Sequence, residues 1–353
     1  MAQHKPNQCN PGAEFSFLNS PAYSSQILSP LQALSFVSRA YGSMARAFWS
    51  VLVNILLSLM LLFGVNIHRA VAEGEGGQTQ PGQKPLVVTT IKPLTMIAHA
   101  VLGDLVEIRQ LLPDTEVPHH FSLRMSDRRL LDRADLIVWV GPGMETFLVN
   151  ILDSQKDGSV LTAAELNSVF WPEGTGQGRD YHLWLNPDNA LALAQSLVES
   201  MADLKGSDRA LLATNLHRFE QEITELKSRI SERLLTVKGA IFIADHDAFS
   251  HFTTAFGLRS AGFLRDGSGL EIGVREMAQL MAKEGVSCLI AEPESRLDRM
   301  QKIAETLGSK LEVIDPLGAD ITLLVEDSNT AYGRFLASIA DGFYRCLNGS
   351  GSD

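Results

Sequence analysis

Four residues from separate segments could together bind a metal ion. His119 stands in a polar loop, His182 precedes a predicted helix, and His246 lies at the end of a buried apolar run. Three neutral imidazoles and a carboxylate such as Asp315 would form a tetrahedral site of the kind that zinc accepts. Their spacing alone does not show that they meet, so the residue types leave a shared metal site as one interpretation.

The other histidines fit less specific positions. His99 falls inside a helical pattern and His217 lies on a long predicted helix, which favours ordinary helix positions for both. His251 comes one turn after a predicted strand, which favours a supporting or structural role. The sequence assigns no definite role to His120 or His251.

Motifs of the common enzyme classes are missing from the sequence. It has no H-E-x-x-H, no C-x-x-C and no phosphate-binding glycine loop, and residues 141–143 lack the rest of a dinucleotide fingerprint. A Ser-His-Asp triad stays open, although no G-x-S-x-G turn marks a nucleophile. A zinc-dependent hydrolase is an alternative, because three histidines and a water also form a catalytic site, in which Asp247, Glu292 or Asp315 could act as the base.

One long helical segment separates two similar parts of the chain. In residues 207–237 apolar side chains recur every three or four positions without an internal Gly or Pro, which predicts a helix of roughly 45 Å. Strand and helix patterns alternate before and after it. This order predicts an α/β fold with two parallel-sheet lobes joined by one long rigid helix, although an ordinary helix packed on a single core is the alternative. Ligands of such sheets bind beyond the carboxyl ends of the strands. The expected strand-end residues are Asp245, His246, Glu292 and Asp315.

Composition excludes some partners. The chain has 353 residues, of which 45% are hydrophobic and 20% charged, and its formal net charge is -11. This is a globular composition with room for two domains and an extension. An acidic chain without runs of Lys or Arg is a poor candidate for binding nucleic acid.

The amino-terminal segment has the pattern of an export signal. Residues 1–43 are polar and show no sustained period, whereas Met44-Ala45-Arg46 begins a basic and then apolar run that ends near Ala70-Val71-Ala72. This pattern predicts a secretory signal peptide, with Met44 as a hypothetical translation start. The run is also long enough for a membrane helix. No Cys stands directly after this run, so we expect a periplasmic protein without a lipid anchor.

The predicted organisation follows from these segments. It comprises a leader and signal peptide in residues 1–72, a flexible lead-in in 73–84, an N-terminal α/β lobe in 85–206, the linking helix in 207–237 and a C-terminal α/β lobe in 238–353. After removal of the leader, Cys288 and Cys346 are the remaining cysteines. An oxidising compartment would allow them to pair, and two buried free thiols are the alternative.

Seven ordered blocks of sequence resemble one known family. They are TTIKPL at 89–94, the stretch 111–127 with PHHFSLRMSD, ADLIVWVGP at 134–142, HLWLNP at 182–187, HDAF at 246–249, CLIAEP at 288–293 and DPLG at 315–318. Together they resemble the periplasmic zinc-binding proteins of ABC transporters, from about residue 86 to residue 347. The resemblance implies a monomeric solute receptor, not an enzyme, that binds a metal between two lobes and delivers it to a membrane permease.

The resemblance also implies the site residues. The histidines of the P-H-x-[YF], H-L-W-L and H-D-A-[YF] blocks bind metal in the family, and they correspond to His119, His182 and His246. Manganese-binding relatives carry a glutamate at the third position, so three imidazoles favour Zn(II) as the transported ligand, because manganese prefers oxygen ligands. Asp315 is the candidate fourth ligand. A manganese or iron receptor of the same family is the alternative, and a disulfide between Cys288 and Cys346 is implied.

The sequence departs from the family pattern at several points. His120 stands where Asp is usual, and Met125 where Pro is usual. Many zinc-binding members carry a long loop rich in His, Asp and Glu before the second ligand, whereas residues 171–180 are short and contain no His. The resemblance therefore does not extend to a histidine-rich loop for collecting zinc.

Overall fold

The computed structural model describes residues 84–118, 121–156, 158–173, 179–202, 204, 207–265, 270–324 and 327–348. The predicted leader, signal peptide and Met44 start lie outside the described residues, as do His119 and His120. Every described residue belongs to one compact unit, Gly76–Asp353. Within these described ranges no helix is both long enough and apolar enough to cross a membrane.

The N-terminal half is built on a parallel sheet with the strand order β2-β1-β3-β4. Its strands are β1 (Leu86–Thr89), β2 (Glu107–Gln110), β3 (Leu136–Trp139) and β4 (Val160–Thr162). Its helices are α3 (Lys92–Leu102), η1 (Gly103–Leu105), α4 (Met125–Asp132), η3 (Thr146–Leu148), α5 (Val149–Leu152), η4 (Ala163–Glu165), η5 (Leu183–Leu185) and α6 (Pro187–Ala202). The central strands β1 and β3 are apolar and buried, as expected for parallel strands covered on both faces, whereas β2 at the edge alternates exposed and half-buried residues.

The C-terminal half repeats this arrangement with the strand order β6-β5-β7-β8. Its strands are β5 (Ile241–Ala244), β6 (Arg259–Phe263), β7 (Val286–Ala291) and β8 (Lys310–Val313). Its helices are η6 (Leu235–Val237), α8 (Ser250–Phe256), α9 (Val274–Met281), α10 (Leu297–Leu307), η7 (Ser328–Thr330) and α11 (Ala331–Leu347). All pairings in both sheets are parallel, which confirms the predicted α/β class.

The long helix predicted between the two sheets is α7 (Arg209–Leu234), with 26 residues and a length of about 39 Å. The Asp208 side chain caps it by accepting a hydrogen bond from Leu211 N at 3.0 Å. Its buried stripe consists of Leu212, Phe219, Ile223, Leu226, Ile230 and Leu234. The helix packs against α3 and α6 of the N-terminal half and against α8 of the C-terminal half. It therefore contacts both halves, as a linking helix should.

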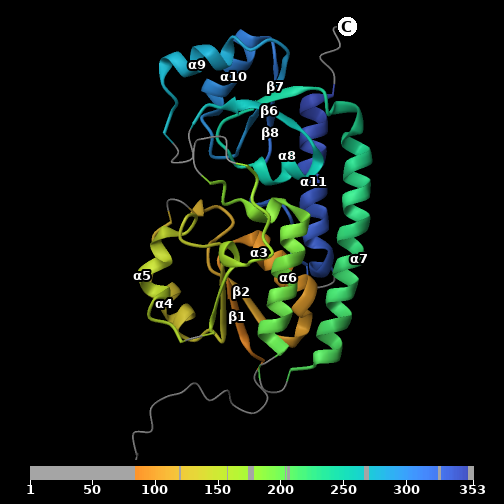
Figure 1. Ribbon diagram of the computed structural model, residues 1–353. Coiled ribbons are helices and arrows are strands. Elements are labelled where there is room, and N and C mark those ends of the chain that lie inside the picture. The colour runs from red at the N-terminus through yellow and green to blue at the C-terminus, as the bar shows by residue number, and fades with distance from the viewer. Residues whose placement is uncertain are drawn as a thin grey trace, which may run out of the picture. The chain divides into compact units, whose positions relative to one another are not determined.

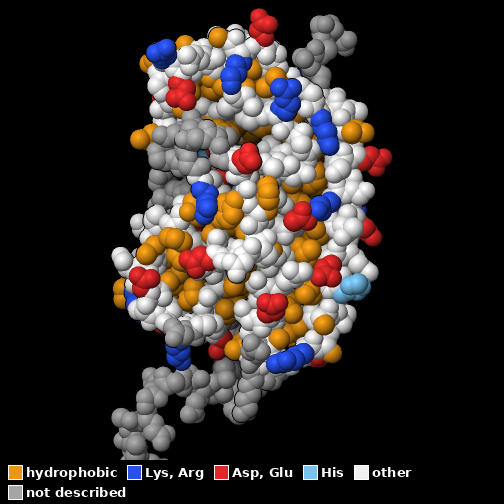
Figure 2. Space-filling view, in the orientation of Figure 1, with side chains coloured by type: hydrophobic (Ala, Val, Ile, Leu, Met, Phe, Trp, Pro, Cys, Tyr) orange, Lys and Arg blue, Asp and Glu red, His pale blue; other side chains and the backbone are white. Residues whose placement is uncertain are grey.

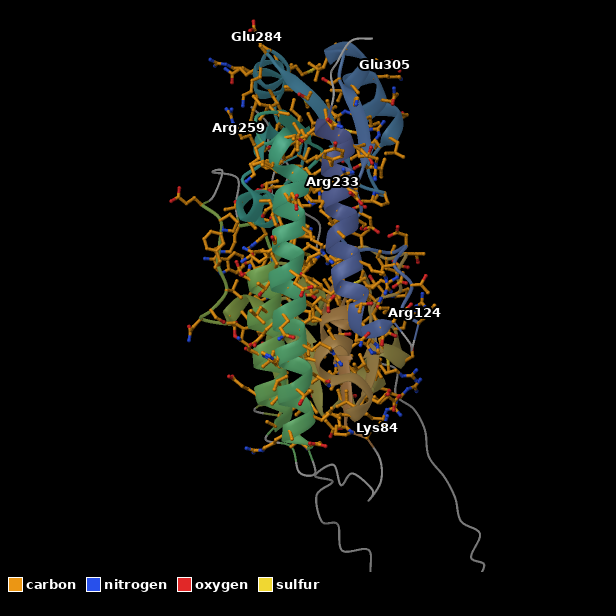
Figure 3. The ribbon with its side chains drawn as sticks, turned by 90° about the vertical axis from the view of Figure 1, so that its right-hand side faces the viewer. Lys84, Arg124, Arg233, Arg259, Glu284 and Glu305 are labelled. Atoms are coloured by element: carbon orange, nitrogen blue, oxygen red, sulfur yellow. A yellow bond between two sulfur atoms is a disulfide. The ribbon has the colours of Figure 1, made fainter. Side chains whose placement is uncertain are left out.

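A second helix, α11, also contacts both halves. It packs against α3 in the N-terminal half, against β7 and β8 in the C-terminal half, and along α7. Figure 3 shows α7 and α11 side by side along the molecule, and Figure 1 places both on the same side of the two sheets. Two neighbouring helices, not α7 alone, thus join the halves.

The C-terminal half is further tied by a disulfide between Cys288 on β7 and Cys346 on α11. Both cysteines are buried, with their Cα atoms 5.5 Å apart, so the pairing implied by the family resemblance is confirmed. The main core runs through both halves. A smaller core lies under α9 and α10 and contains Ile243, Leu264, Leu280, Leu289, Ala291, Met300 and Ala304. On the face shown in Figure 2, acidic and basic side chains are interspersed.

Candidate metal centre

The fold brings two of the predicted ligands together from opposite halves. His182 directly precedes η5 in the N-terminal half, and His246 follows β5 in the C-terminal half. Their ring centroids are 5.4 Å apart and the ring planes are inclined by 61°. His119 lies outside the described residues, so its predicted place beside these two rings stays a prediction.

A carboxylate close in sequence orients His182. Asp180 Oδ1 accepts a hydrogen bond from His182 N at 2.8 Å and lies 2.7 Å from His182 Nδ1. A proton on Nδ1 donated to this carboxylate leaves the lone pair of the imidazole on Nε2, the arrangement common among metal-binding histidines. Burial, with a smaller effect of His246, lowers the pKa of His182 well below its ordinary value. The ring is therefore neutral at neutral pH, the form that binds metals.

A carboxyl group at the end of a neighbouring strand lies against His246. Glu292 directly follows β7, and its Oε1 contacts His246 Nδ1. Burial lowers the pKa of His246 and raises the pKa of Glu292 to about 8, and it is the largest cause of each shift. In the metal-free protein both groups are therefore mostly uncharged at neutral pH. A cation bound at His246 would favour the charged carboxylate, so this pair can respond electrostatically to a metal.

Asp315, the candidate fourth ligand, caps a turn. It follows β8, and its Oδ1 and Oδ2 accept hydrogen bonds from Leu317 N at 2.8 Å and Ala319 N at 2.6 Å. A carboxylate has further lone pairs, so these bonds leave acceptor capacity for a ligand. Within the described ranges, no group of three or more His, Cys, Asp and Glu residues is arranged to hold a metal ion. The set of His119, His182, His246 and Asp315 therefore stays a prediction.

The partners of the two histidines were not identified from the sequence. Asp180 stands two residues before His182, a spacing that would have been compatible with a local contact. The sequence predicts Glu292 as a strand-end carboxylate and as a possible base of a hydrolase, whereas its pairing with His246 depends on β7 lying beside β5. Neighbouring Asp245 is already occupied, since its Oδ2 accepts hydrogen bonds from Arg265 and Ser295, both at 2.5 Å.

The sequence matches one known family over most of its length. A sequence model described as "Zinc-uptake complex component A periplasmic" matches residues 87–343 of the chain. A relative named "High-affinity zinc uptake system protein ZnuA" in Haemophilus ducreyi is 29% identical over 291 residues, covering 74% of this chain and 93% of the relative. A protein of the same name in Yersinia pestis is 28% identical over 292 residues, covering 74% and 91%.

Solved structures show the same fold. A crystal structure of ZnuA has a TM-score of 0.64 at 21% identity, covering 75% of this chain and all of that one. A zinc-bound ZnuA deletion mutant has a TM-score of 0.66 at 20% identity, covering 76% of this chain and 100% of that one. The periplasmic zinc-binding protein TroA of Treponema pallidum has a TM-score of 0.65 at 19% identity, covering 75% of this chain and 99% of that one.

The family is a substrate-binding component of transport, which confirms that the protein is not an enzyme and sets aside the zinc hydrolase alternative. The family is periplasmic and serves zinc uptake, in agreement with the predicted compartment. The chain belongs to the ZnuA family of periplasmic zinc-uptake complex components.

Proposed function

We propose that this protein captures Zn(II) between its two halves through His119, His182 and His246, and delivers it to the permease of an ABC importer. The observation that carries the proposal is the approach of His182 and His246 to a ring separation of 5.4 Å, each with a carboxylate at Nδ1. Relatives described as zinc uptake proteins support the identity of the metal.

The residues fit zinc chemically. Neutral imidazoles suit Zn(II), and a carboxylate at the second ring nitrogen raises the basicity of the ligand. Asp315 is the proposed fourth ligand, with a water as the other possible occupant of that position. Protons compete with the metal for the imidazoles, so zinc affinity should fall as the solution is acidified.

Metal binding is proposed to cause little closure of the two halves. Both α7 and α11 contact the two halves, and a hinge motion would have to bend or separate two packed helices. Small-angle scattering of the chain from residue 73 onward, with and without zinc, should give nearly the same radius of gyration. A large decrease on adding zinc would contradict this part of the proposal.

The deciding experiment measures zinc stoichiometry and affinity on the chelator-stripped chain from residue 73 onward. We expect one tightly bound zinc per chain that resists excess manganese. His119→Ala, His182→Ala and His246→Ala should each lose most of the affinity. His217→Ala is the control, because His217 is exposed on α7. Binding that is weak, or indifferent to the three histidines, would overturn the proposed site.

The alternative metal and the delivery step are tested separately. Manganese or iron that displaces zinc at equal concentration would favour the alternative receptor within the family. For delivery, deletion of the gene in its own host should impair growth in zinc-depleted medium, and added zinc should restore it. Restoration by the wild-type gene, but not by the His246→Ala variant, would link transport to the proposed site.

A further inference from the structure

His251 on α8 is a fully buried imidazole whose two nitrogens both face the N-terminal half. Its Nδ1 lies 3.1 Å from Asn189 Nδ2, and its Nε2 lies 3.0 Å from the Asp180 carbonyl oxygen. An amide nitrogen only donates and a carbonyl oxygen only accepts. His251 therefore carries its proton on Nε2 and accepts at Nδ1, and each nitrogen has the partner that its tautomer requires.

The orientation of the Asn189 amide supports this assignment. Asn189 is fully buried on α6, and its Oδ1 accepts a hydrogen bond from Phe170 N at 2.7 Å. Its Nδ2 lies 3.0 Å from Phe170 O and 3.2 Å from Leu183 O, so its two protons are shared among these carbonyls and His251 Nδ1. The backbone N–H of Phe170 fixes which end of the Asn189 amide is the oxygen. The other end, Nδ2, is therefore the atom that faces His251.

Asp180 connects His251 to the proposed ligand His182. Its carbonyl oxygen accepts from His251 Nε2, while its Oδ1 receives both the backbone nitrogen and Nδ1 of His182. The other carboxylate oxygen, Oδ2, is buried and has no hydrogen-bond partner among the described residues. The bond from His251 therefore restrains the backbone of Asp180, and the two His182 contacts hold its Oδ1.

An aromatic cluster covers this link. The Trp171 ring packs edge-on against His251 and Tyr181, with centroid distances of 5.5 Å in both cases. The Arg179 guanidinium lies 4.2 Å from the Trp171 ring centroid, a cation–π distance. Trp171 therefore contacts His251 as well as Tyr181 and Arg179, two residues that directly precede the Asp180–His182 pair or lie within it.

We propose that His251 is a positioning residue that holds Asp180 and thereby fixes the orientation and tautomer of His182 for metal binding. The inference rests on the proposed function in one respect, namely that His182 is a ligand. Its consequence is that the C-terminal half supplies one ligand, His246, and also sets the geometry of a ligand in the other half. Zinc affinity then depends on how the two halves pack against each other at His251.

Three substitutions separate the two hydrogen bonds of His251. In His251→Gln the side-chain amide reaches the place of Nε2 and can donate to the Asp180 carbonyl. In His251→Asn it reaches only the place of Nδ1, and His251→Phe keeps the ring but removes both bonds. We expect about tenfold weaker zinc binding for the Asn and Phe variants, and affinity near wild type for the Gln variant. His217→Asn is the control on an exposed histidine.

A readout that needs no metal keeps this inference separate from the proposed function. Long-range proton–nitrogen NMR of the metal-free protein should show His182 protonated on Nδ1 in the wild type and the Gln variant, and a mixture of tautomers in the Phe and Asn variants. An unchanged His182 tautomer in the Phe variant would overturn the inference. Equal affinity losses in all three variants, in step with thermal stability, would also overturn it by showing a merely structural role. A wild-type chain that binds no zinc would refute the proposed function, and the NMR result would still decide on His251.

Discussion

Two buried glutamates occupy corresponding places in the two halves. Glu145 lies in the loop after β3, and Glu292 directly follows β7, the strand at the same place in the second sheet. Both are almost completely buried, and burial raises their pKa values to about 7 and about 8. Their partners differ. Glu145 accepts hydrogen bonds from Thr90 Oγ1 at 2.5 Å, Val140 N at 3.2 Å and Gly141 N at 2.9 Å, whereas Glu292 contacts the ring of His246.

The difference assigns the two carboxyl groups different roles. All three donors to Glu145 belong to the N-terminal half and two are backbone amides, so this group joins the ends of β1 and β3 whatever is bound elsewhere. Glu292 faces a titratable ring at the proposed metal site, so its ionisation should respond to the charge at that site. The buried carboxyl of one half therefore fixes loops, whereas that of the other half lies against the proposed ligand His246.

The disulfide is the largest difference expected between the halves, because the described part of the N-terminal half has no equivalent. It closes a loop of 58 residues, so replacing both cysteines by alanine should lower the free energy of unfolding by about 4 kcal/mol. Urea unfolding of the metal-free protein measures this change. A reducing agent should destabilise the wild type similarly and leave the variant unaffected. A loss below about 1 kcal/mol would show that packing of α11 on β7 holds this half without the bond.

Glu145 should make the stability of the metal-free protein depend on pH. Its pKa in the folded state, about 7, lies above its ordinary value of 4.5, so its contribution is full below about pH 4.5 and is lost as the pH rises through 7. Between pH 4.5 and 7.5, Glu145→Gln should remove up to about 3 kcal/mol of this decline. Urea unfolding at both pH values tests it, with exposed Glu232→Gln on α7 as the control. Equal slopes in wild type and variant would refute a buried, proton-binding Glu145.

Elements with a continuous apolar run or stripe could be predicted from the sequence. β1, β3, β5 and β7 are continuous apolar runs, and α7 has an uninterrupted apolar stripe. The edge strands β4 and β6 carry no such pattern, because β4 has only three half-buried residues and β6 contains Arg259, Ser260 and Gly262. Helix α9 begins only at Val274, and Glu271 before it forms an isolated β-bridge with Arg265.

The candidate site was predictable only in part. Residue types suggested histidine ligands, and the family resemblance selected three of them, but neither could supply their supporting partners. Glu292 meets His246 only because β7 pairs with β5, and His251 meets Asp180 only because the two halves pack together. Such contacts between distant segments leave no periodic pattern in the sequence.

Zinc affinity should separate Glu292 from Glu145 directly. Glu292→Ala removes the carboxylate at His246 Nδ1 and should weaken zinc binding by about 10–100-fold. Glu145→Gln is the matched control in the other half, with an expected change below about twofold, because its partners do not include a proposed ligand. Competition with a chromogenic chelator measures both variants. Equal losses would mean that the two carboxyl groups serve the same structural purpose.

The junction of the halves should give the smallest effect. Trp184 Nε1 donates to Pro316 O at 2.8 Å, and Tyr332 OH donates to Trp184 O at 2.8 Å, so two buried hydrogen bonds join the N-terminal half to the C-terminal half at Trp184. Trp184→Phe and Tyr332→Phe should each lower the free energy of unfolding by about 1 kcal/mol.

Both variants should still unfold in one transition, followed by circular dichroism and by fluorescence, because the main core is continuous through both halves. Two separate transitions in Trp184→Phe would instead show that these bonds are what couples the halves. In that case the two halves would be nearly independent domains, one with Glu145 and the other with Glu292. The packing of His251 against the N-terminal half would then depend on the bound metal.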